Sequence, residues 1–108
     1  MDIMQDRIAV FEQMLADDAN NTMVMFGLAK EYEKAGRHAD VIRVLEPYIA
    51  NADDEGNAYG VLANAYARTG SREKAVETYR KGIEVSMAHG HPSMANDYRM
   101  TLEMDFAE

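Results

Sequence analysis

The chain has 108 residues, with 19 acidic side chains against 11 Lys and Arg and a formal net charge of −8. It contains no cysteine, which excludes disulfide bonds and thiolate chemistry. Phosphate backbones are bound through clustered Lys and Arg, so the acidic balance argues against nucleic acid or an anionic membrane as the partner, although acidity also simply keeps a small protein soluble.

Apolar residues recur at three- and four-residue spacing along nearly the whole chain, which predicts an all-α fold. Six helices are expected, over about residues 2–16, 22–35, 38–50, 55–69 and 72–87, and from the Gly90-His91-Pro92 break to about 105. Gly36 and Gly70 follow the second and fourth of these, where a left-handed residue closes a helix. Asp53 and Asp54 precede the fourth helix and Ser71 precedes the fifth, so these side chains can cap free amides. Such short connections favour antiparallel neighbours.

No segment approaches the roughly 20 apolar residues that a membrane-spanning helix needs. The start of the chain, Met1-Asp2-Ile3-Met4, lacks the basic residues and apolar stretch of a signal peptide. We therefore expect a cytoplasmic protein.

An internal repeat organises the sequence. Tyr32 and Tyr66 lie 34 residues apart, and the same spacing relates four further pairs: Leu28 and Leu62, Ala29 and Ala63, Gly36 and Gly70, and Ile49 and Ile83. A fixed period of about this length is typical of a helix-turn-helix unit stacked on copies of itself. We expect an α-solenoid of antiparallel helical pairs.

These positions resemble the tetratricopeptide repeat, as found in small stand-alone bacterial proteins. The signature positions are filled by Met25, Leu28, Ala29, Tyr32, Gly36, Val41 and Leu45 in one copy, and by Tyr59, Leu62, Ala63, Tyr66, Gly70, Ala75 and Tyr79 in the next. The resemblance implies a single domain over 1–108, with a half repeat at 1–21, full repeats at 22–55 and 56–89, and a capping helix at 90–108. If the capping helix kept the 34-residue spacing, Asn96 and Asp97 would take buried positions. We therefore expect this helix to pack one residue out of register, through Ala95, Tyr98 and Leu102.

The resemblance also implies a function, because such repeats bind another protein or a peptide along the inner face of each first helix. Position by position, the candidate peptide-binding residues are Met23, Phe26, Lys30, Lys34, Asn57, Asn64, Arg68 and Tyr98, and Glu33, Gly60 and Ala67 lie on the same faces. Cations and an amide beside exposed Phe and Met suit a peptide with an acidic group next to an apolar anchor. The alternative is that Lys30, Lys34 and Arg68 are ordinary solvated charges.

A second hypothesis concerns the nine methionines, which cluster towards the two ends of the chain. Most of them can be explained as core or cap packing, since Met adapts to irregular gaps. Met100 and Met104, however, lie off the main stripe of the last helix. The protein could therefore instead be a structural subunit that forms a homodimer or larger homo-oligomer through its terminal helices.

Catalytic and metal chemistry find little support in the sequence. His89 and His91 lack the third and fourth ligands of a metal site, and the Asp pairs at 17–18 and 53–54 lack the spacing of a calcium loop. The sequence contains no nucleophile triad or phosphate-binding loop. We expect a protein that is not an enzyme and that uses no cofactor.

Overall fold

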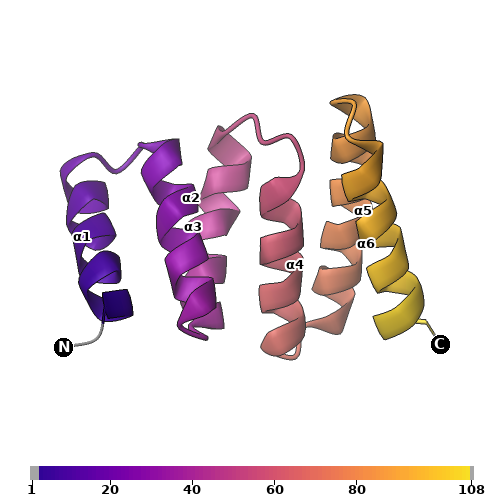
Figure 1. The fold of residues 1–108 in the computed structure, drawn as a ribbon, viewed down its shortest axis with the longest axis horizontal. Helices are drawn as coiled ribbons and strands as arrows, with labels where there is room; N and C mark the ends of the chain where they lie inside the picture. Colours follow the sequence, from indigo (N-terminus) through magenta and orange to yellow (C-terminus); the bar gives the residue numbers. More distant parts are fainter. Residues whose placement is uncertain (1–2, 108) are drawn as a thin grey trace. The chain divides into compact units, whose positions relative to one another are not determined.

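The chain folds into helices connected by short turns. The computed structural model describes residues 3–107, and the side chains of residues 3 and 4 are not described. Over that range the elements are α1 (Ile3–Asp17), α2 (Thr22–Lys34), α3 (His38–Asn51), α4 (Asn57–Arg68), α5 (Arg72–Ala88) and α6 (Pro92–Asp105) (Figure 1). The predicted all-α class is confirmed, and the helix ends lie within two residues of the expected ones. The expected start at Asp2 and the methionines at 1 and 4 lie outside the described residues or side chains.

The helices group into two compact units. The first unit, Met1–Ala52, contains α1, α2 and α3, and the second, Asp53–Glu108, contains α4, α5 and α6. Within each unit, consecutive helices pack as neighbours, α1 on α2 and α2 on α3 in the first, α4 on α5 and α5 on α6 in the second. The helix-turn-helix arrangement predicted from the repeat is therefore present in both units.

Three turns share one closing geometry. Gly36, Gly70 and Gly90 have positive φ values of 74°, 87° and 77°. In each turn the amide of the residue after the glycine donates to a carbonyl five residues back, at 2.8–2.9 Å: Arg37 to Tyr32, Ser71 to Tyr66, and His91 to Ser86. Glycine takes this left-handed conformation at little cost, and the pattern is the Schellman ending of a helix.

The helix starts are capped in different ways. The Asn21 side chain accepts a hydrogen bond from the Val24 amide at 3.1 Å. Before α4, the Asp54 carboxylate accepts from the amides of Gly56 and Ala58 at 2.9 and 3.0 Å, as expected of an acidic cap. The expected cap at Ser71 is wrong, since its side chain makes no capping hydrogen bond within the described part of the chain. Its backbone φ and ψ of −95° and 68° lie away from the extended conformation that presents a capping hydroxyl.

The two cores differ in the size of their side chains. The core of the first unit is built from large residues, among them Ile8, Leu28, Tyr32, Val41 and Leu45, all at most 1% exposed. The second unit buries alanines completely at 58, 63, 75 and 95 and supplies its bulk through tyrosines. Small residues let helices approach closely, so the tyrosine rings can reach across from one helix to the next.

The last helix packs as the register argument predicts. Ala95 is fully buried, whereas Asn96 and Asp97 are exposed. The Tyr98 ring centroid lies 5.7 Å from that of Tyr79, and the Phe106 ring centroid lies 5.8 Å from that of Tyr79. Both contacts hold α6 against α5. Among residues 3–107, none of the helices combines the length and the apolar character required to cross a bilayer.

Candidate interaction surfaces

The first candidate surface lies on α2 and is called the α2 face: Met23, Phe26, Lys30 and Lys34. These residues recur at three- and four-residue intervals, so they share one side of the helix. Met23 is 84% exposed. Phe26 is half-buried, and its ring stacks on Tyr48 of α3 with 5.7 Å between centroids. An exposed thioether therefore lies one turn from an aromatic ring that is held in place.

The cations of the α2 face are already paired. The Lys30 ammonium lies 3.2 Å from Glu33 Oε1. The Lys34 ammonium lies 3.8 Å from Glu31 Oε1, which Arg7 of α1 also approaches at 3.4 Å. Glu31 is itself 7% exposed, and its second oxygen, Oε2, is buried without a hydrogen-bond partner among the described residues. An acidic ligand would have to compete with these carboxylates, so the α2 face offers its apolar pair more readily than its charges.

The second candidate surface lies on α4 and is called the α4 face: Asn57, Asn64 and Arg68. Asn57 and Arg68 are exposed and Asn64 is half-buried. Gly60 occupies the repeat position that Phe26 has on α2, and the phenol of Tyr98 lies over it. A methyl group at Gly60 would come within 2.6 Å of the Tyr98 ring. The ring of α6 thus covers the part of α4 that corresponds to Phe26.

The Tyr98 side chain therefore packs against α4 and is only partly exposed. Its hydroxyl donates to the Gly56 carbonyl at 2.6 Å and accepts from the Gly60 amide at 3.2 Å. Burial raises the pKa of this phenol, against the lowering effect of the Gly60 amide. The hydroxyl is therefore occupied within its own unit.

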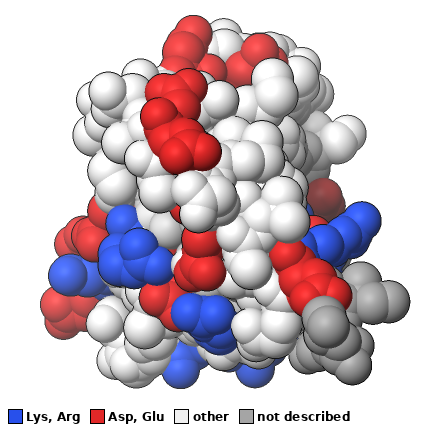
Figure 2. Space-filling view, turned by 90° about the vertical axis from the view of Figure 1, so that its left-hand side faces the viewer, with Lys and Arg blue, Asp and Glu red and all other residues white. Residues whose placement is uncertain are grey.

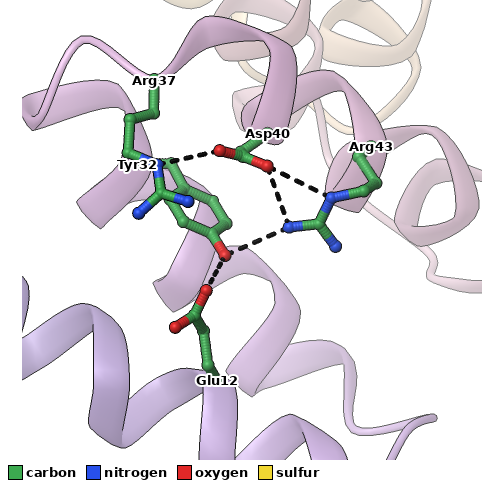
Figure 3. Close-up of polar contacts among 5 residues, drawn as sticks. All are labelled: Glu12, Tyr32, Arg37, Asp40 and Arg43. Atoms are coloured by element: carbon green, nitrogen blue, oxygen red, sulfur yellow. Dashed lines mark hydrogen bonds and ion pairs between the residues drawn. The ribbon is translucent and has the colours of Figure 1, made fainter.

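A polar cluster that the sequence did not predict joins the three helices of the first unit (Figure 3). The fully buried Tyr32 donates from its hydroxyl to Glu12 of α1 at 2.5 Å and accepts from Arg43 of α3 at 3.1 Å. Arg37 lies over the Tyr32 ring, 4.6 Å from its centroid. Asp40 accepts from Arg37 at 2.8 Å and from Arg43 at 3.1 Å, so the two guanidinium groups share one carboxylate.

The cluster shifts the pKa values of Tyr32, Asp40 and Arg43. Burial, followed by the hydrogen bond to Glu12, raises the pKa of Tyr32. Burial alone would raise the pKa of Asp40, but the hydrogen bonds from Arg37 and Arg43 outweigh it and lower that pKa. Burial likewise opposes the charge on Arg43, yet its bonds to Asp40 and Tyr32 raise its pKa. The arrangement stabilises a neutral phenol between charged neighbours, and it joins α1 to α2 through Glu12 and α3 to α2 through Arg43.

Two histidines lie beside carboxylates in the second unit. His91 Nε2 is 2.6 Å from Glu55 Oε1, and His89 Nε2 is 3.7 Å from Asp53 Oδ1. The hydrogen bond from His91, with its charge, lowers the pKa of Glu55. These contacts join the segment before α4 to the α5–α6 turn. The described residues contain no group of three or more His, Cys, Asp or Glu placed to hold a metal ion.

Further apolar side chains are exposed on α1 of the first unit and on α6 of the second. On α1, Val10 and Met14 are 58% and 44% exposed, and on α6, Met100 and Met104 are 56% and 78% exposed. Figure 2 faces the α1 side, where uncharged atoms cover much of the surface and Lys and Arg are confined to its lower part. The position of Met100 and Met104 off the buried stripe of α6 agrees with the sequence analysis.

Comparison with known proteins identifies the family. The family model of the bacterial transcriptional activator domain, BTAD, matches residues 5–89. The chain belongs to the BTAD family. The match spans α1 to α5, so it includes the α2 face, the α4 face and the Tyr32 cluster.

A solved structure supports the same fold for this BTAD-family chain. The crystal structure of MamA is similar with a TM-score of 0.70 and 19% sequence identity, over 97% of this chain and 75% of that one. At this identity the likeness concerns the fold alone, which is a helical repeat in agreement with the sequence analysis. The tetratricopeptide assignment itself stays a resemblance, because the family model that matches is BTAD. The search of curated proteins found no match.

Proposed function

We propose that the chain is a protein-interaction module that binds a peptide or a helix of a partner protein through the α2 face, with the α4 face as a second contact. The BTAD family is named for a domain of bacterial transcriptional activators. We therefore further propose that the partner is a protein that takes part in the regulation of bacterial transcription. The role is one of binding and not of catalysis.

One observation carries this proposal: Met23 is 84% exposed beside Phe26, whose ring is fixed on Tyr48. Burying a methionine side chain fully contributes about 1.5–3 kcal/mol. A ring that is already ordered loses little further conformational entropy when a partner covers it. The α2 face is therefore suited to an apolar side chain of a partner, such as the anchor of an amphipathic helix.

The charges of the chain support a protein partner over DNA. The net charge is −8, and Lys30 and Lys34 are paired with Glu33 and Glu31. Binding to a phosphate backbone relies on several Lys and Arg that release counterions. We propose that if this chain acts in a complex that contacts DNA, another chain or segment makes that contact.

Capture of partners from bacterial lysate with matched variants tests the proposal. Met23→Glu places a charge on the α2 face without disturbing the core, and Met87→Glu on α5 is the control because Met87 is 49% exposed. We expect the wild type and Met87→Glu to retain the same defined protein, identified by mass spectrometry, and Met23→Glu to lose it. Equal capture by all three would overturn the assignment of the α2 face.

A further inference from the structure

The exposed side of α1 corresponds to a side of α3 that is buried. One repeat period before Val41, Leu45 and Tyr48 of α3 stand Arg7, Phe11 and Met14 of α1. The three α3 residues are at most 9% exposed, whereas Met14 is 44% exposed and the Arg7 side chain is 61% exposed. A shallow depression on this side of α1 is lined by Asp6, Arg7, Val10 and Phe11.

One side of α6 is also open. A shallow depression there is lined by Asp97, Met100, Thr101, Met104 and Asp105. Asp97, Met100 and Met104 are exposed, whereas Ala95 on the packed side of α6 is fully buried. In the repeat pattern α1 is a second helix and α6 a first helix, and in the structure each has one side with exposed apolar side chains.

Charge decides which combination of these two sides is favourable. The rim of the α6 depression is acidic, through Asp97 and Asp105, whereas the rim of the α1 depression carries one cation, Arg7, beside one acid, Asp6. Pairing α6 with α6 would place aspartates against aspartates, which is unfavourable. Pairing α6 with α1 instead places Arg7 beside the aspartates and buries Met100 and Met104 against Val10 and Met14.

We propose that α6 of one copy docks on α1 of a second copy, so that the chain associates head to tail with itself. The contact is heterologous and can therefore continue into a longer array. It uses residues distinct from the α2 face, so it goes beyond the proposed function and does not depend on it.

Two variants that each block one end test this arrangement. Val10→Glu with Met14→Glu charges the α1 side, and Met100→Glu with Met104→Glu charges the α6 side. All four residues are exposed, so both variants should keep the wild-type circular dichroism and thermal transition. Met87→Glu serves as the control for an added charge at an exposed methionine. The mass of each protein is measured by light scattering across concentration.

We expect the mass of the wild type and of Met87→Glu to rise above the 12.1 kDa monomer with concentration, and each blocked variant alone to stay monomeric. An equal mixture of the two blocked variants retains one free α1 side and one free α6 side, so it should form a dimer and nothing larger. A wild type that stays monomeric, a blocked variant that dimerises alone, or a mixture that stays monomeric would each overturn the proposal.

A charge exchange provides a second test, in which circular dichroism of each variant is compared with the wild type because Arg7 also lies 3.4 Å from Glu31 Oε1. Arg7→Glu should weaken association by at least about tenfold, because it turns the only cation among the described residues that line the α1 depression into a fourth acidic group at the contact. Adding Asp97→Arg to the same chain should restore most of the loss. If the double variant associates no better than Arg7→Glu alone, the proposed pairing of α1 with α6 is incorrect.

Discussion

The hydroxyl of Tyr98 bridges the first turn of α4, donating to the Gly56 carbonyl at 2.6 Å while its ring lies against Gly60. The absence of a side chain at Gly60 is what allows this approach. The Gly82 position on α5 contributes in the same way, since a methyl group there would lie 3.0 Å from the Tyr98 ring. The docking of α6 therefore depends on two glycines that look like weak points in their helices.

Gly60→Ala should destabilise the second unit. Alanine is the better helix former by about 1 kcal/mol, but its methyl group would lie 2.6 Å from the Tyr98 ring, and overpacking of this kind costs about 1–3 kcal/mol. We expect a lower free energy of unfolding in urea. In a Tyr98→Ala background the clash is gone, so Gly60→Ala should there be neutral or stabilising. The same loss in both backgrounds would show that the contact with Tyr98 is not the cause.

Ala63→Leu should destabilise the fold, because Ala63 is fully buried at a signature position of the repeat. Overpacking predicts a loss of about 1–3 kcal/mol. Ala39→Leu on the exposed side of α3 is the matched control and should change the thermal transition little. A thermal melt of Ala63→Leu that equals the wild type would contradict the repeat phasing.

Tyr32→Phe should destabilise the first unit by removing the hydrogen bonds of the hydroxyl to Glu12 and from Arg43. Bonds to charged groups contribute about 1.5–3 kcal/mol, and we expect the lower end because Glu12 and Arg43 are exposed and regain water. Urea unfolding of the wild type and of Tyr32→Phe measures the difference. Tyr59→Phe, which leaves this cluster intact, is the control and should lose less.

The raised pKa of Tyr32 predicts a loss of stability at alkaline pH. The folded state holds the phenolic proton more tightly than the unfolded state, whose pKa is near the ordinary 10.0, so unfolding releases a proton in this range. The stabilisation that Tyr32 contributes is present in full below the unfolded-state pKa, and it declines as pH rises through the folded-state pKa. Tyr32→Phe should flatten this decline in urea midpoints measured against pH. An equally steep decline in the variant would show that other groups are responsible.

Asp40 should act at the opposite end of the pH scale. Its folded-state pKa lies below the ordinary 3.8, so its contribution is present above that value and is lost as pH falls through the folded-state pKa. Asp40→Asn removes the titration, and its midpoint should fall less steeply than that of the wild type over the same acid range. The comparison is made by urea unfolding at matched ionic strength, because partly exposed ion pairs are screened by salt.

The sequence carries much of the fold because its signals are local. Gly36, Gly70 and Gly90 mark helix ends by a conformation that other residues adopt at a cost, and the structure has all three at positive φ. The register of α6 also follows from the sequence, since burying Asp97 would leave a carboxylate without water. Ser71 shows the limit of such signals, because a residue of the right type lacks the backbone geometry of a cap.

The contacts between side chains of different helices could not be predicted in the same way. Glu12 and Tyr32 are separated by 20 residues and meet only because α1 packs on α2 at a particular rotation. Periodicity indicates which side of a helix is buried, but it does not indicate which rotamer a long side chain adopts. The cover of Gly60 by Tyr98 is a contact of this kind, and the pairing of Lys30 with Glu33 within α2 likewise depends on rotamers. Both change how the α2 and α4 faces are interpreted.

Site-specific photocrosslinking in bacterial cells tests the central claim, that the α2 face binds a partner protein, most directly. A photoreactive amino acid replaces Met23 in one version of the chain and Met87 in the other, since both side chains are exposed. We expect a discrete covalent adduct with a second protein from position 23 that is absent from position 87 and is lost when Phe26→Ala is added. Identical adducts from both positions, or adducts only between copies of the chain itself, would contradict it.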